Sequence, residues 1–135
     1  MPGYSGTPLP RKLGIKPQAR VLFSEMPSDV KQELGEVLAS CSFVRQRTAP
    51  ADFIMVFVRT QAELTKLFSS SKKQLTPDGM LWVGWPKKTS GVPSDLDENI
   101  VRKIGLDAGL VDVKVCAVTD VWSGLKFVYR LKDRK

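Results

Sequence analysis

The sequence contains no histidine and only two cysteines, and these shortages exclude several kinds of site. Ser-His-Asp and Cys-His catalytic arrangements both need an imidazole, so neither mechanism is open to this chain. Two isolated cysteines without histidine cannot furnish a conventional structural zinc site, and the acidic residues do not have the spacing of a calcium-binding loop. We therefore expect no metal site and assign no catalytic residue.

Long apolar runs are also missing. No run reaches the roughly 18 residues of a membrane span, and the first ten residues lack the charged and apolar regions of an export signal. Cys41 and Cys116 lie in apolar stretches outside any C-x-x-C pair, which favours buried free thiols over a disulfide. We expect a cytoplasmic protein with no membrane partner.

The net charge of +7 is concentrated at the two ends of the chain. Residues 1–20 carry +4 and residues 125–135 carry +4, which leaves −1 for residues 21–124. Solvated termini explain this distribution most simply. A weak nucleic-acid binder remains an alternative, but it requires that the folded chain bring these basic residues onto one contiguous face.

The first half of the chain alternates short apolar runs with helical patterns. Thr7 followed by Pro8, and the stop at Gly14, predict a short helix over residues 8–13. The further predictions are strands at Arg20–Ser24, Ser42–Arg47 and Phe53–Val58, and one helix opened by Pro27-Ser28-Asp29 with Val30, Leu34, Val37 and Leu38 on its buried face.

The second half continues this alternation and ends in a hairpin. Thr60 and Glu63 have capping-box spacing and predict a helix start. Thr119–Gly124 is too short for a helical crossover, so the last two strands must be antiparallel. The predicted elements are a turn at Thr76–Gly79, strands at Met80–Trp85, Val111–Val115 and Leu125–Leu131, and a helix capped by Ser94 with Leu96, Ile100 and Ile104 buried and Gly109 at its end.

These elements predict an α/β fold, a three-layer Rossmann-like sheet of about six strands that is mostly parallel and closes in a C-terminal antiparallel hairpin. We expect one domain over residues 1–135, in which residues 1–18 form an arm and a short helix. The expected strand order is two, one, three, four, six, five, with the final strand antiparallel to both of its neighbours.

Three segments resemble the class I methyltransferase family. Leu13-Gly14-Ile15-Lys16 resembles the approach to that family's first strand, Asp52-Phe53-Ile54 its fourth strand, and Leu75–Leu81 its L-x-P-G-G turn. The resemblance covers most of the chain and implies a methyltransferase-like fold. It fails where the cofactor is bound, because Ser24–Ser28 contains no glycine and Pro27 lacks an amide donor.

A second β-α unit, which would carry the acid that binds the cofactor ribose, is also missing from residues 25–51. We therefore expect no cofactor and a non-catalytic binding or regulatory domain. The Trp82–Gly91 segment W-V-G-W-P-K-K-T-S-G, with Gly3–Leu9 and Trp122–Lys126, resembles a small bacterial family of short cytoplasmic proteins of unknown function. That resemblance implies no activity.

A candidate site follows the fourth predicted strand. In open α/β sheets, ligands bind beyond the carboxyl ends of the parallel strands. The ammonium groups and hydroxyls of this loop suit a phosphate or carboxylate, although a solvated loop tip would have the same composition. The loop consists of Lys87, Lys88, Thr89, Ser90 and Gly91, and it lacks the full phosphate-binding motif of nucleotide hydrolases.

Three further residues are assigned to this site. Glu25 follows the first strand and could bond a ligand hydroxyl, and Trp122 and Ser123 lie at the hairpin. Trp122 is expected either to cover the core or to form a binding platform, whereas Trp82 and Trp85 are expected in the core. We expect Glu25 and Lys87 at one edge of the sheet, in a single crevice.

The function therefore stays open between two classes besides nucleic-acid binding. One is the non-catalytic binding domain, and the other is an enzyme or sensor for a small anionic or phosphorylated metabolite. The segment Gly3–Thr7 could form a backbone nest for an anion or a flexible arm.

Overall fold

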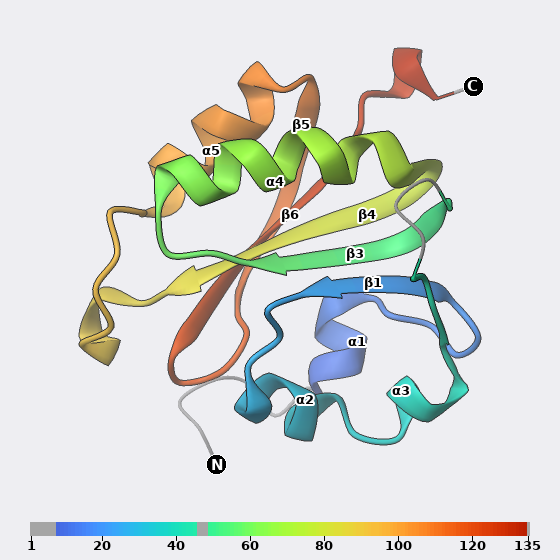
Figure 1. Ribbon diagram of the computed structural model, residues 1–135, viewed down its shortest axis with the longest axis horizontal. Helices are drawn as coiled ribbons and strands as arrows, with labels where there is room; N and C mark the ends of the chain where they lie inside the picture. The colour runs from blue at the N-terminus through green and yellow to red at the C-terminus, as the bar shows by residue number, and fades with distance from the viewer. Residues whose placement is uncertain (1–7, 46–48, 135) are drawn as a thin grey trace.

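The computed structural model describes residues 8–45 and 49–134. A six-stranded sheet lies between two layers of helices, with α4 and α5 on one face and α1, α2 and α3 on the other (Figure 1). The helices are α1 (Leu9–Leu13), α2 (Ser28–Leu34), α3 (Val37–Ser40), α4 (Gln61–Gln74) and α5 (Glu98–Asp107), and the strands are β1 (Arg20–Ser24), β2 (Ser42–Phe43), β3 (Ala51–Phe57), β4 (Leu75–Pro86), β5 (Leu110–Ala117) and β6 (Trp122–Tyr129).

The strand order β2-β1-β3-β4-β6-β5 confirms the expected topology. The first four strands in this order are parallel, and β6 is antiparallel to β4 and β5. Right-handed crossovers place the parallel strands side by side, and the short β5–β6 link forces a hairpin.

The central strand β3 is buried on both faces, as its unbroken apolar sequence predicts. Ile54 and Val56 belong to the core beneath α4 and α5, whereas Phe53 and Met55 belong to the core beneath α1, α2 and α3. Trp82 lies in this second core and donates its indole N–H to the Leu13 carbonyl at 2.9 Å. This bond attaches α1 to the centre of the sheet.

Two of the expected side-chain caps fall on described residues, and one of these two is wrong. Thr60 and Glu63 form a complete capping box at the start of α4, as predicted. Helix α5 is capped by Asp97, which accepts the backbone N–H of Ile100, rather than by Ser94. The Ser94 hydroxyl donates to the Arg59 carbonyl at 2.8 Å and accepts the backbone N–H of Leu96, before the helix begins. Of the three residues expected to be buried, Leu96 is buried, whereas Ile100 and Ile104 are only half-buried. Val101, within the helix, is fully buried.

Three other expectations need correction. The single helix after β1 is two short helices, since Gly35 has a φ of 59° and breaks it. Strand β2 is only Ser42–Phe43, and part of the expected Ser42–Arg47 strand lies outside the described residues. Thr76–Gly79 is not a turn between elements but a bulge within β4, because Leu75 pairs with Ala51 and Met80 with Phe53.

Other expectations lie outside the structure or are partly met. Thr7 and the Gly3–Thr7 segment lie outside the described residues, so the predicted cap and anion nest stay predictions. Cys41 and Cys116 are free thiols, as expected, but both are half-buried. Among the residues described, no helix is long and apolar enough to cross a membrane.

Candidate functional site at the carboxyl edge of the sheet

The parallel strands β1, β3 and β4 end at the same edge of the sheet, and the predicted site residues follow these ends. Glu25 comes directly after β1 and Lys87 directly after β4. The register of β1 with β3 and of β3 with β4 therefore confirms that both residues lie at the carboxyl edge. Strand β6 begins at the same edge, because Trp122 pairs with Pro86.

The structure forms two cavities at this edge rather than one crevice. The first has a volume of about 270 Å³ and is lined by Glu25, Pro27, Phe57, Arg59, Glu63 and Trp122. The second has a volume of about 290 Å³ and is lined by Trp85, Lys87, Lys88, Thr89, Leu96, Asp97, Glu98 and Ser123. The cavity that contains Glu25 is thus distinct from the one that contains both lysines.

The first cavity is closed by Trp122, which is only 6% exposed. Its ring lies edge-on to Phe57, with ring centroids 5.3 Å apart and an interplanar angle of 84°. A carboxylate oxygen of Glu63 already accepts hydrogen bonds from the backbone N–H groups of Arg59 and Thr60. Glu25 is exposed and its φ of 56° lies in the left-handed region, which non-glycine residues rarely adopt.

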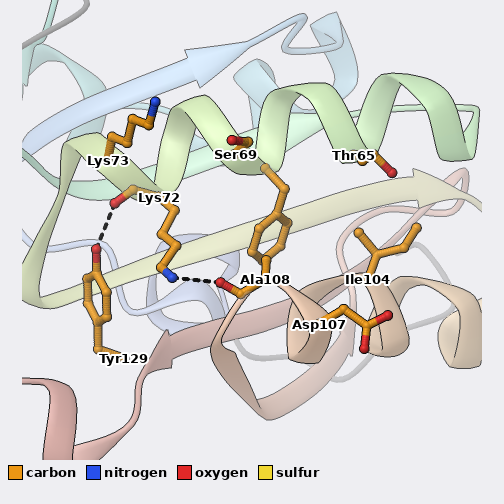
Figure 2. A pocket seen from close by; sticks show the side chains of 9 residues that line it. Thr65, Ser69, Lys72, Lys73, Ile104, Asp107, Ala108 and Tyr129 are labelled. Atoms are coloured by element: carbon orange, nitrogen blue, oxygen red, sulfur yellow. Dashed lines mark hydrogen bonds between the residues drawn. The ribbon is translucent and has the colours of Figure 1, made fainter.

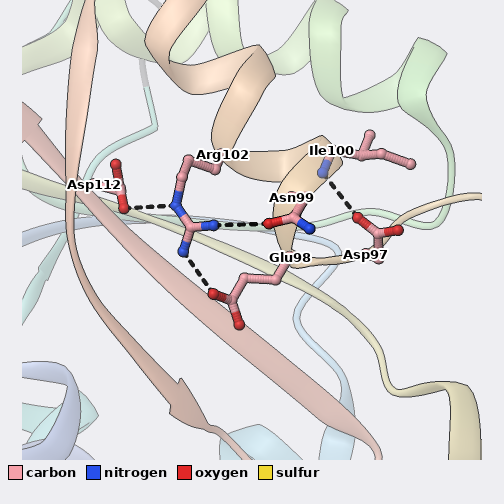
Figure 3. A network of polar contacts seen from close by, with 6 residues as sticks. All are labelled: Asp97, Glu98, Asn99, Ile100, Arg102 and Asp112. Carbon is pink, nitrogen blue, oxygen red and sulfur yellow. Dashed lines mark hydrogen bonds and ion pairs between the residues drawn. The ribbon is translucent and has the colours of Figure 1, made fainter.

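The second cavity carries the two lysines of the predicted anion site, opposite two acids that are engaged elsewhere. Asp97 accepts the backbone N–H of Ile100 at 2.8 Å, which caps α5. Glu98 accepts from Arg102 at 2.6 Å in the polar network of Figure 3. No ion pair is formed by Lys87 or Lys88 within the ranges that the structure describes.

The remaining predicted loop residues shape the second cavity without lining it. The Ser90 hydroxyl donates to the Lys87 carbonyl at 2.6 Å and accepts from the backbone N–H of Val92. Gly91 has a φ of 79°, which ends the short 3-10 turn Lys88–Ser90. Ser90 and Gly91 therefore position Lys88 and Thr89.

A third cavity, about 570 Å³, lies away from this edge, between the C-terminal halves of α4 and α5 (Figure 2). Lys72 donates to the Ala108 carbonyl at 2.6 Å, and Tyr129 donates to the Lys72 carbonyl at 2.7 Å. These bonds join α4 to the end of α5 and to β6, so the polar groups in the cavity hold the helical layer together. The sequence gives no sign of this cavity, since Lys72 and Tyr129 are 57 residues apart.

Two further kinds of chemistry, metal binding and thiol reactivity, depend on the carboxylates and cysteines of the chain. Among the residues described, no three His, Cys, Asp or Glu side chains cluster as metal ligands. Burial raises the pKa of the Cys116 thiol, although the charges of Lys12, Lys114 and Lys87 oppose this rise. A raised thiol pKa lowers the fraction of reactive thiolate.

Comparisons with known proteins identify the fold. No protein-family model matches the chain, and neither does any curated protein. An S-adenosylmethionine (SAM)-dependent methyltransferase from Aquifex aeolicus aligns with a TM-score of 0.58 and 16% identity, over 87% of this chain and 85% of that one. The magnesium protoporphyrin IX methyltransferase of Synechocystis PCC 6803 with bound SAM aligns with a TM-score of 0.58 and 16% identity, over 90% of this chain and 74% of that one.

A third match is the Aeropyrum pernix fibrillarin with natively bound SAM, at a TM-score of 0.55 and 13% identity, over 90% of this chain and 69% of that one. These likenesses establish a methyltransferase-like Rossmann fold and, at such identities, nothing finer. The resemblance of the sequence to class I methyltransferases is thereby confirmed at the level of the fold.

The residues of this chain do not fit SAM at the edge where such a fold would hold it. The loop after β1 contains no glycine, so its backbone cannot approach a cofactor closely. It contains the exposed Glu25 instead, and Pro27, which has no backbone N–H to donate. No acid follows β2 between Ser42 and Ala51.

Proposed function

We propose that this protein is a non-catalytic ligand-binding or regulatory domain on a methyltransferase-like scaffold that does not bind SAM. The observation that carries the proposal is the loop Ser24–Ser28, which has no glycine and presents the Glu25 carboxylate and Pro27 to the cavity. Without a glycine in this loop, the backbone cannot approach the cofactor closely, and Pro27 donates no backbone hydrogen bond to it.

The ligand that suits the edge best is a small anion held in the second cavity. Lys87 and Lys88 supply two ammonium groups, and Thr89 and Ser123 supply hydroxyls. The nearby acids are neutralised by the α5 N-terminus and by Arg102. The distinctive W-P-K-K-T-S-G string contains most of these residues, and its resemblance to the small bacterial family of cytoplasmic proteins extends the same proposal to that group.

A thermal-shift titration tests this ligand class directly. Inorganic phosphate, sulfate and ATP are added separately, and a ligand at ten times its Kd stabilises the folded chain by about 1.4 kcal/mol, which raises Tm by about 4–6 °C. Lys88→Gln should abolish most of the rise, whereas Lys66→Gln, a matched change on the exposed face of α4, should not. Equal responses of both variants, or no rise with any anion, would contradict the anion site.

A reactive alternative is an enzyme that acts on a phosphorylated metabolite in the same cavity. It would share the thermal shift but would also convert its ligand. Following the bound metabolite by ³¹P NMR over hours separates the two, since a binding domain leaves the phosphorus spectrum unchanged.

A further inference from the structure

The fold brings lysines from both basic ends of the chain onto one face of the sheet. Lys114 on β5 and Lys126 on β6 are directly opposite one another in the antiparallel ladder. Lys126 is also opposite Trp82, which belongs to the core beneath α1, α2 and α3. Directly opposed residues project from the same face, so both lysines lie on the face that carries α1.

A β-bulge is responsible for the position of Lys114. Asp112 pairs with Phe127 and Lys114 with Lys126, so Val113 is one extra residue on β5. Asp112 bonds Arg102 of α5 at 2.8 Å on the other face. Without the extra residue, Asp112 and Lys114 would share a face, and the bulge thus separates Lys114 from the nearest acid of its own strand.

Helix α1 adds Lys12 to this surface. The Lys12 ammonium donates to the Ala117 carbonyl at 2.7 Å, and the Lys114 ammonium donates to the Lys12 carbonyl at 3.0 Å. We call Lys12, Lys114 and Lys126, with Lys87 at the carboxyl edge, the lysine row. The charges of Lys12, Lys114 and Lys87 all act on the Cys116 thiol, which places Cys116 among them.

Lys114 and Lys126 of the lysine row repel each other across the β5–β6 ladder. Like charges directly opposite in a ladder are destabilising. Burial, and then the charge of Lys114, lower the pKa of Lys126. Within the described ranges, Lys87, Lys114 and Lys126 form no ion pair. An anion placed over the pair would relieve this repulsion.

The row is too long for one small anion. Lys126 is level with Trp82, and Lys87 comes directly after Pro86, the last residue of β4, so about 17 Å of backbone, at about 3.4 Å per residue, separates Lys126 from Lys87. A chain of regularly spaced phosphates can contact Lys12, Lys114 and Lys126 on the α1 face and continue over the carboxyl edge to Lys87, whereas a single phosphate can contact only neighbours. Among residues 8–45 and 49–134, no exposed aromatic ring lies in the row, and the contacts that we propose are with phosphates.

We infer that the lysine row binds the phosphate backbone of a nucleic acid strand, without sequence preference. This site shares only Lys87 with the anion cavity. The contiguous basic face that a nucleic-acid binder requires is thus formed by residues from the two basic ends, together with Lys87 and Lys114 from between them.

The test is fluorescence anisotropy with a labelled 20-nucleotide oligo(dT), titrated at about 50 mM salt and at rising salt. Three or four phosphate contacts give a slope of log K against log salt of about −2 to −3 for a single strand. The double variant Lys114→Gln/Lys126→Gln should bind about tenfold more weakly and reduce the slope by about 1–2. Lys31→Gln/Lys66→Gln removes the same charge from exposed positions on α2 and α4 and should bind within about twofold of wild type.

Absence of binding by the wild type at about 50 mM salt, or equal weakening by the two double variants, would overturn the inference. Thermal unfolding of both variants checks folding, and Lys126→Gln is expected to unfold no earlier than wild type because it removes a repulsion. The phosphate-induced thermal shift should persist in Lys114→Gln/Lys126→Gln, since Lys88 and Thr89 are retained. Failure of the row and failure of the anion cavity are therefore distinguishable.

Discussion

Trp122 at the start of β6 lies edge-on to Phe57 at the end of β3, with their ring centroids 5.3 Å apart. This contact joins the C-terminal hairpin to the central strand at the edge where the candidate cavities lie. Because Trp122 is 6% exposed and Phe57 3% exposed, the pair closes the core from that edge. The hairpin tryptophan therefore contributes to the wall of the first cavity through a side chain that the core already needs.

Replacing Trp122 with alanine should cost about 3 kcal/mol of unfolding free energy, because a buried aromatic side chain is lost and a cavity remains. Trp122→Phe, which keeps an apolar ring beside Phe57, should cost less than half as much. Urea unfolding followed by circular dichroism measures both. A cost below about 1 kcal/mol for Trp122→Ala would mean that the ring is an exposed platform instead of part of the core.

Gly105 on α5 should not tolerate alanine. A Cβ atom there would lie 2.0 Å from Cε1 of Phe127, a buried ring on β6 that also packs edge-on against Phe68. We expect Gly105→Ala to destabilise the protein by about 1–3 kcal/mol, despite the better helix propensity of alanine. The double variant Gly105→Ala/Phe127→Leu should be less destabilised than the two single costs added together, and simple additivity in equilibrium unfolding would refute the steric account.

The Arg20–Asp52 pair should make part of the stability sensitive to acid. A bidentate contact at 2.9 Å from Arg20, more than any other cause, lowers the pKa of Asp52 below its ordinary value of 3.8. The contribution of this ion pair to the unfolding free energy is complete above the ordinary pKa of Asp52 and is lost as the pH falls through the lowered pKa. Since both side chains are more than a third exposed, it should amount to at most about 1 kcal/mol.

Urea unfolding of wild type and Asp52→Asn at pH 7 and near pH 2 checks this window. The variant should be less stable at pH 7, and the two proteins should converge in acid. Asp107→Asn, which breaks the more exposed pair with Lys103, is the matched control and should cost less at pH 7. A constant difference between wild type and Asp52→Asn across the pH range would argue against the ion pair.

Lys126→Gln should stabilise the protein by about 0.5 kcal/mol at pH 7, since it removes the repulsion with Lys114. The pKa of Lys126 is lowered in the folded protein, so in the alkaline range below its ordinary 10.5 the folded state releases this proton first. Stability of the wild type relative to the variant therefore rises with pH in that window. A variant less stable than wild type at pH 7 would show that the Lys114–Lys126 pair does not destabilise the folded protein.

The strand order was predictable because each strand had a local signal. The unbroken run from Phe53 predicts a strand covered on both faces, and Thr60 with Glu63 predicts the start of α4. The helix break was not predictable, since Val30 and Leu38 keep helical spacing across Gly35 and a glycine alone does not end such a pattern.

Two features that sequence reasoning missed arise from tertiary contacts. Ser94 and Asp97 are both good helix caps, and the helix begins at Asp97, while Ser94 bonds the Arg59 carbonyl of a distant segment. The Lys114–Lys126 pair depends on one extra residue in β5, which reverses the face that strand alternation assigns to Lys114. Neither effect has a signal in the local sequence.

The central claim, that the scaffold binds small anions and not the cofactor of its structural neighbours, is tested most directly by isothermal titration calorimetry. SAM and ATP are titrated separately into the full chain under the same low-salt conditions. The account predicts no heat of binding for SAM at ligand concentrations up to about 1 mM and a saturable signal for ATP that Lys88→Gln weakens. A low-micromolar Kd for SAM would contradict it.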